Sequence, residues 1–420
     1  MLGIWLWDRY FGEADGYAPG TEEMALVKID RDLRLSDAMA EDRQWLQWLA
    51  GVDDPAPARR NALEVFKKLA NEKAISLQGL EAFAIVKAEH HGIPVGDMLA
   101  EFVQGQIAAD FTETSGQLAN HQGTWWHTKW VDAMEKNLRP ACQWRQSFEQ
   151  DSRQLRIRAI MARSAVWLIG LAGLFCIPGT LVTLKRGFHA KPHGYGGAWS
   201  LPLGLVVFFV ATLAWIGFTT TLELGIESLP NLHPALGIFL DSAARLLPSL
   251  IALGLLFRRP SHAIGGLGLN RAITPTAILG LFSLLMIADQ GLRSSIGSQS
   301  GADPGGGLNA GEAGLWGLAF ALISACLLAP LAEELLYRGV LFRSFWNRFG
   351  VIPAMVLSSV IFAVLHFYDG CGLAMVGTFG LSCALLYAAT GSLGSAIALH
   401  MLYNSAIKIP EWLIYHAALG

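Results

Sequence analysis

The sequence predicts an all-α protein, a polytopic membrane helix bundle of about eight helices preceded by a helical extramembrane domain. Its 420 residues are 53% hydrophobic, with a mean hydropathy of +0.39, which is too apolar for an ordinary soluble enzyme. Charges are segregated, since residues 1–163 hold 24 of the 34 acids and 19 of the 31 bases. We therefore expect a polar domain over residues 1–160 and a membrane domain over residues 161–420.

The sequence of the polar domain predicts several amphipathic helices. In one of them Leu63, Phe66, Leu69 and Ala70 recur at helical spacing and predict a buried face. Further along, the tryptophan-rich stretch 125–130 and four arginines between residues 153 and 163 suit either of two places. They could lie along the bilayer surface, or they could form an ordinary connector helix packed on this domain.

The membrane domain contains apolar runs of the length that a bilayer requires, roughly 20 residues. The runs cover about residues 164–184, 198–222, 234–257, 273–289, 313–335, 351–367, 371–390 and 392–407. The third run contains Asp241 and Arg245, which lie four residues apart and can pair on one helix face. Two interpretations are open for this pair, a structural role inside the bundle or a place along the path of a substrate.

The charge pattern bears on partners and location. The net charge is only -3, without a long basic run, so we expect the lipid bilayer and no nucleic acid as a partner. The apolar start Met1–Asp8 has neither a basic region nor a small-residue cleavage pattern, and so does not resemble a signal peptide. We expect a multi-pass integral membrane protein whose N-terminal domain is cytoplasmic, although the basic loops of the membrane domain argue for the reverse orientation.

Three apolar segments carry ionisable or amide side chains that are costly to place in a membrane. The first ends in Glu333-Glu334-Leu-Leu-Tyr-Arg338, in which Glu334 and Arg338 can pair across one helical turn. The second ends in Phe362-Ala-Val-Leu-His366, and the third contains His400-Met-Leu-Tyr-Asn404. A single histidine on an apolar helix is usually a core residue, but this combination predicts a functional site.

Hydrolysis of a peptide bond needs a base that activates water and donors that hold the developing oxyanion. Glu333 is the candidate base, His366 can orient the water, and His400 with Asn404 could bind the oxyanion. Another division of roles makes Glu333, His366 and His400 ligands of a zinc ion, with Glu334 as the base. Both divisions stay open at the level of the sequence.

The three motifs, in this order, resemble those of the CPBP intramembrane proteases, also called Abi proteins, which include the type II CAAX prenyl endopeptidases. The family is marked by Glu-Glu-x-x-x-Arg, Phe-x-x-x-His and His-x-x-x-Asn/Asp motifs, and the likeness covers about residues 164–410. It implies an eight-helix membrane fold and a protease with a catalytic glutamate that cleaves its substrate near the membrane. Its substrate would be a membrane-associated protein or peptide, either prenylated or unmodified.

Two other function classes compete with a protease. A membrane transporter or channel would use the buried Glu, His and Arg side chains as a proton relay, but the sequence shows no second copy of the Glu-Glu motif such as an inverted repeat would supply. An inactive membrane scaffold is the third possibility, against which the intact motifs argue. Residues 1–160 lie outside this resemblance, contain no catalytic motif, and are predicted to regulate or target the membrane domain.

Overall fold

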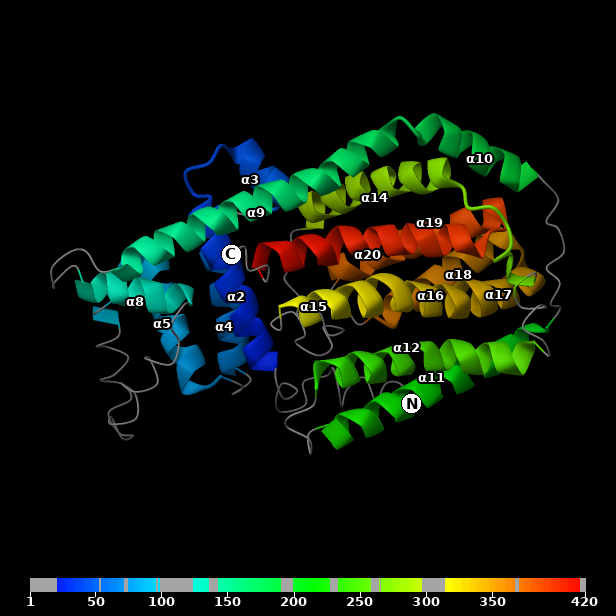
Figure 1. Ribbon diagram of the computed structural model, residues 1–420, viewed down its shortest axis with the longest axis horizontal. Coiled ribbons are helices and arrows are strands. Elements are labelled where there is room, and N and C mark those ends of the chain that lie inside the picture. Colours follow the sequence, from blue (N-terminus) through cyan, green and yellow to red (C-terminus); the bar gives the residue numbers. More distant parts are fainter. Residues whose placement is uncertain are drawn as a thin grey trace. The chain divides into compact units, whose positions relative to one another are not determined.

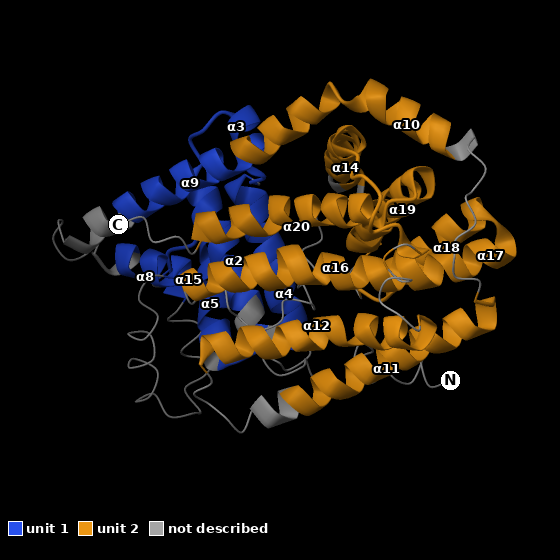
Figure 2. Cartoon of the chain, turned by 45° about the vertical axis from the view of Figure 1, so that its right-hand side comes forward, with its two compact units in different colours: residues 1–163 blue, residues 164–420 orange. Residues whose placement is uncertain are grey.

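A computed structural model describes residues 21–52, 54–71, 75–95, 97–98, 124–135, 143–189, 199–226, 233–257, 264, 266–296, 314–366 and 370–415. Over these residues the chain is helical and contains no strand. The chain divides into two units, residues 1–163 and 164–420 (Figure 2). The point of division lies within a few residues of the predicted boundary between residues 160 and 161. The apolar start Met1–Asp8 lies outside the described residues.

The first unit is a small helical domain. Its helices are α2 (Thr21–Ala38), α3 (Gln44–Ala50), α4 (Pro55–Asn71), α5 (Leu77–His91), α8 (Trp125–Glu135) and the first part of α9 (Gln143–Leu174). The predicted face of α4 is confirmed for Leu63, Phe66 and Leu69, which are buried in the core of this unit, whereas Ala70 is only partly buried. The core also encloses Glu81, and burial raises the pKa of its carboxyl group to about 7.

Two of the tryptophans considered for the bilayer surface belong to this core instead. Trp125 is fully buried and Trp126 is 3% exposed, and the indole of Trp125 donates to Asp37 Oδ2 at 2.8 Å. Lys129 lies over the Trp125 ring at 5.2 Å, a cation–π contact. The structure therefore favours the connector alternative for this stretch, since these aromatic rings fill the domain interior.

The second unit consists of long helices that lie side by side (Figure 1). They are the second part of α9 (residues 164–174), α10 (Ile177–His189), α11 (Leu201–Ile226), α12 (Pro234–Leu256), α14 (Pro275–Ile296), the composite helix from Leu315 to Phe349, α18 (Val351–Val364), α19 (Gly370–Thr390) and α20 (Leu393–Tyr415). Glycines allow several of them to approach closely. A Cβ added to Gly173 would clash with the carbonyl group of Leu279, and one added to Gly187 would clash with that of Ala389.

Six helices in the described part of the chain are long and apolar enough to cross a membrane. They cover Glu149–Leu174, Leu201–Leu222, Pro234–Leu256, Pro275–Leu292, Leu315–Phe349 and Gly370–Thr390. The predicted all-α polytopic membrane bundle is confirmed, with differences in its parts. The segment predicted at 164–184 is divided between α9 and α10, because Pro178 has no amide hydrogen to continue a helix. The segment at 351–367 forms a helix of only 14 residues.

The composite helix carries the Glu-Glu motif and changes its winding along its length. It comprises α15 (Leu315–Phe320), the π-helical η3 (Ala321–Leu328), α16 (Ala329–Glu333), the π-helical η4 (Glu334–Phe342) and α17 (Arg343–Phe349). The change from α16 to η4 falls between Glu333 and Glu334. Runs of π-helix are rare and are often found at functional sites. The π-helical segments of this composite helix therefore indicate that a functional site lies along it.

Candidate active site

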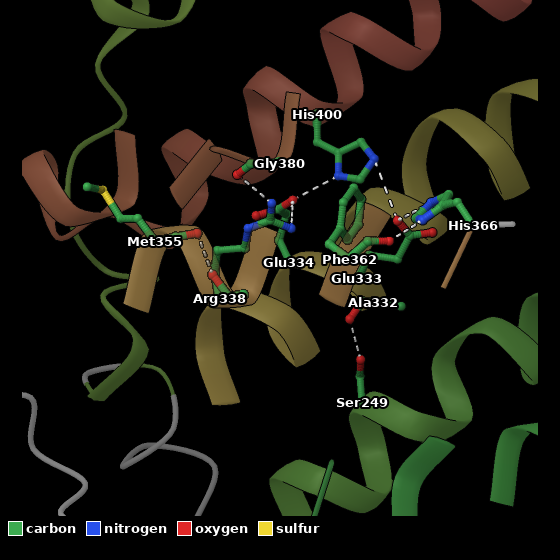
Figure 3. Close-up of polar contacts among 11 residues, drawn as sticks. Ser249, Ala332, Glu333, Glu334, Arg338, Met355, Phe362, His366, Gly380 and His400 are labelled. Carbon is green, nitrogen blue, oxygen red and sulfur yellow. Dashed lines mark hydrogen bonds and ion pairs between the residues drawn. The ribbon is translucent and has the colours of Figure 1, made fainter. Parts of the chain in front are cut away.

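The two neighbouring glutamates occupy different environments (Figure 3). Glu334 is fully buried and pairs with Arg338, whose Nη1 lies 3.1 Å from Glu334 Oε1. Arg338 is also fully buried, and its Nη2 donates to the Gly380 carbonyl oxygen at 2.7 Å. Its guanidinium lies over the Phe362 ring at 4.6 Å. The predicted pairing of Glu334 with Arg338 is therefore present, in a setting where neither charge has water to solvate it.

Glu333 has a partly exposed carboxylate and faces two imidazole rings. Its side chain is 28% exposed, and its Oε2 lies 3.9 Å from His366 Nε2 and 3.8 Å from His400 Nε2. The structure thus brings together three residues from distant parts of the sequence. Glu333 is the last residue of α16, His366 lies two residues after the end of α18, and His400 lies on α20. These are the three residues that the sequence singled out for water activation or metal binding.

The hydrogen bonds of His400 fix the role of each ring nitrogen. Its Nδ1 lies 2.9 Å from Glu334 Oε1, and a carboxylate paired with an arginine can only accept. We therefore assign the proton of the neutral ring to Nδ1, which leaves a lone pair on Nε2. This lone pair points toward Glu333.

His366 has the same arrangement with a different partner. Its Nδ1 lies 2.6 Å from the Phe362 carbonyl oxygen, which also can only accept, so Nδ1 carries the proton. Its side chain is 26% exposed. As a result, the acceptor nitrogens of the two neutral rings, Nε2 of His366 and Nε2 of His400, lie 3.9 and 3.8 Å from Glu333 Oε2.

Acceptors as close together as Glu333 Oε2 and the two histidine Nε2 atoms can be bridged by a shared donor or by a cation. At 3.8 and 3.9 Å the direct separations are too long for hydrogen bonds, whereas one intervening water can bridge groups at such distances. A water molecule has two O–H groups and satisfies two of the three acceptors. The third is satisfied when one imidazole holds a second proton.

A zinc ion is the other group that the donor set suggests. One carboxylate and two neutral imidazoles, each with its second nitrogen engaged, match the ligands that zinc prefers. In a tetrahedral site with metal–ligand distances of about 2.0–2.1 Å the donor atoms lie about 3.4 Å apart, closer than those observed. No group of three or more His, Cys, Asp or Glu within the described ranges is arranged to hold a metal. The donors fit zinc in kind but not in spacing.

Aromatic rings pack around the histidines and fix their orientation. Phe379 lies edge-on to the His400 ring at 4.7 Å, and Phe362 lies 4.5 Å from the His366 ring. Phe362 and Phe379 are almost fully buried. They keep water away from the Glu334–Arg338 side of the site, while Glu333 and His366 stay partly accessible.

Asn404 lies one turn after His400 on α20, as predicted, but its amide has a specific partner. Its Nδ2 donates to the Ala325 carbonyl oxygen in η3 at 2.8 Å. This bond joins α20 to the helix that carries the glutamates. One of the two amide hydrogens is thereby engaged in a contact between helices.

Other residues that support the site have no ionisable group and were missed by sequence reasoning. Ser249 of α12 donates to the Ala332 carbonyl oxygen at 2.6 Å, next to Glu333. Gly380 leaves room for Arg338, because an added Cβ would lie 3.1 Å from its Nη2. A serine and a glycine within apolar helices are weak signals, because both residues are common in membrane helices for packing alone.

The pair in the third apolar run is also anchored to the composite helix. Arg245 Nε lies 2.8 Å from Asp241 Oδ2 and donates to Ser324 Oγ at 2.7 Å, while Ser324 Oγ also contacts Asp241. Ser324 is fully buried in η3. These contacts support the structural interpretation of the Asp241–Arg245 pair.

Comparisons with known proteins bear on the same part of the chain. Residues 315–406, which include all six predicted site residues, match the family described as type II CAAX prenyl endopeptidase Rce1-like. The chain is also 28% identical over 90 residues to a Bacillus subtilis (strain 168) protein named "Putative membrane peptidase YdiL". This match covers 21% of the chain and 36% of the relative, so the chain spans about a third of the length of that protein. No solved structure gives a significant match to the chain.

Proposed function

We propose, on the premise that residues 315–406 belong to the CPBP/CAAX protease family, that this integral membrane protein is an intramembrane endopeptidase. It would hydrolyse a peptide bond of a membrane-associated protein or peptide. The observation that carries the proposal is the convergence of Glu333 Oε2 with Nε2 of His366 and His400. Such a constellation can bind and activate one water molecule.

In the proposed first step, a water held between Glu333 and a histidine attacks the carbonyl carbon of the scissile bond. Glu333 accepts a proton from the water as general base, and the remaining hydroxide oxygen forms the new C–O bond. The partial exposure of Glu333 and His366 lets water and substrate reach this point. The buried aromatic rings on the other side limit the number of competing waters.

The tetrahedral intermediate carries a negative oxygen that needs a donor. A protonated His400 can donate from Nε2 to this oxygen, since its Nδ1 proton is held by Glu334. Glu334 stabilises the imidazolium, and Arg338 pairs with Glu334 on its other side. Glu333 then returns its proton to the leaving nitrogen as the C–N bond breaks, which regenerates the carboxylate.

The proposal leaves the metal and the substrate class as alternatives to be tested. A zinc ion held by Glu333, His366 and His400 would supply a Lewis acid that lowers the pKa of a bound water. The substrate would be a prenylated or an unmodified polypeptide, a choice that the family resemblance leaves to experiment. The N-terminal unit is proposed to lie in the cytoplasm and to regulate or target the membrane domain.

The experiment compares membrane proteins from cells that contain the native chain or its Glu333→Gln variant. Mass spectrometry should find new polypeptide termini near membrane segments with the native chain and none with the variant. Glu411→Gln is the matched control, because this acid also lies on a helix of the second unit but is 41% exposed and lies 3.5 Å from Lys408 rather than beside a histidine of the site. Identical termini in the native and Glu333→Gln samples would rule out the proposed peptidase.

A further inference from the structure

The composite helix contains a proline three residues before Glu333, and this proline interrupts its hydrogen bonding. At the end of η3 the amide of Ala329 donates to the Ser324 carbonyl, five residues back. The next amide in the same register would be that of residue 330, with the Ala325 carbonyl as its acceptor. Residue 330 is proline, which has no amide hydrogen, so the Ala325 carbonyl lacks this helix partner.

The missing donor is replaced by a side chain from another helix. Asn404 Nδ2 donates to the Ala325 carbonyl oxygen at 2.8 Å. In a membrane interior a carbonyl group without a donor is costly, because no bulk water can replace the bond. The neutral amide supplies the donor without bringing a charge into the bundle.

This bond also sets the position of His400. Asn404 and His400 are four residues apart on α20 and therefore lie on the same face. The Ala325–Asn404 bond fixes this face against η3, and His400 then reaches Glu334 at 2.9 Å and faces Glu333 at 3.8 Å. The distance between Glu333 and His400 thus depends on the Ala325–Asn404 hydrogen bond, which involves neither of these two side chains.

We propose that Asn404 is a positioning residue that replaces the amide hydrogen missing at Pro330, and thereby holds the His400 helix in register with Glu333. The alternative role, donation from Asn404 to the oxyanion of the substrate, would use the second hydrogen of the same amide. The two roles differ in one respect that can be measured. Only the positioning role depends on which residue occupies position 330.

The test is a double-mutant cycle on the full-length protein with Asn404→Ala, Pro330→Ala and both together. Asn404→Ala should lower the thermal midpoint and reduce kcat about a hundredfold, the effect typical of a catalytic group displaced by about 1 Å. Pro330→Ala restores a backbone amide at position 330. In the Asn404→Ala background it should therefore recover most of the thermal midpoint and at least tenfold in kcat.

Pro410→Ala is the matched control, because Pro410 also lies inside a membrane-domain helix, α20, but not opposite Ala325. Combined with Asn404→Ala it should recover neither quantity. Additive effects of Pro330→Ala and Asn404→Ala on the thermal midpoint would overturn the proposal. So would a loss of kcat in Asn404→Ala at an unchanged midpoint, which indicates an oxyanion donor.

The inference rests on the proposed peptidase activity only for the kcat measurement. The thermal midpoint reports the Ala325–Asn404 bond whether or not the protein cleaves a peptide. Absence of any cleavage by the native chain would therefore refute the proposed function, while a non-additive midpoint in the same cycle would still support the role of Asn404.

Discussion

Removing one member of the Glu334–Arg338 pair should destabilise the membrane domain far more than removing both. The two side chains are fully buried, with 3.1 Å between Arg338 Nη1 and Glu334 Oε1. Loss of one partner leaves the other charge buried without compensation, which typically costs about 3–5 kcal/mol. With each 1.4 kcal/mol equal to a factor of ten, Arg338→Met should shift the folding equilibrium by about a hundredfold to several thousandfold.

Arg338→Met also removes the charged donor to the Gly380 carbonyl, and the loss of a hydrogen bond to a charged group costs about 1.5–3 kcal/mol. In the double variant Glu334→Gln with Arg338→Met no buried charge is left, so only this second cost persists. The double variant should therefore be more stable than Arg338→Met alone. It should nevertheless be inactive, because a neutral glutamine cannot stabilise a protonated His400.

The assay is thermal unfolding of the purified full-length protein in detergent, followed by tryptophan fluorescence, together with peptide cleavage. The matched control is the pair Lys408 and Glu411, whose side chains are 34% and 41% exposed at 3.5 Å. Exposed pairs contribute about 0–1 kcal/mol, so Lys408→Met should hardly change the midpoint. A double variant no more stable than Arg338→Met would refute the reasoning, as would an Arg338→Met protein as stable as the native one.

The remaining predictions concern the base, the metal and the first unit. Glu333→Ala should abolish cleavage at an unchanged thermal midpoint, and a lowered midpoint would assign Glu333 to structure instead. Cleavage should survive prolonged dialysis against a chelator if water is activated without metal, whereas loss that added Zn²⁺ restores would support the zinc alternative. A chain that starts near Glu149 retains the Glu149–Leu174 span and should still insert and cleave a short substrate, and a folded but inactive truncated chain would contradict this division of labour. The carboxyl group of Glu81 has a folded-state pKa of about 7, raised by burial above its ordinary 4.5. The folded protein therefore favours the protonated carboxyl group, and the stability that this group contributes is fully present below about pH 4.5 and is lost as the pH rises through 7. Glu81→Gln should raise the unfolding midpoint at pH 8 but not at pH 4, and equal shifts at both values would exclude this cause.

The sequence alone determined the features that depend on local helical geometry. Hydropathy located the apolar segments, because a membrane selects for length and composition along the chain. The four-residue spacing of Glu334 and Arg338, and that of His400 and Asn404, placed each pair on one helix face. The order of the three motifs identified the same region that the family match covers.

Only the tertiary structure decided which atoms meet between helices. The tautomers of His366 and His400 follow from their Nδ1 partners, and the role of Asn404 follows from Ala325, 79 residues away in the chain. Trp125 and Trp126 could be assigned to a core only from their burial, since an aromatic ring suits a domain interior and a bilayer surface equally well. These contacts depend on how helices distant in sequence pack together, and the spacing of residues along one helix carries no information about that packing.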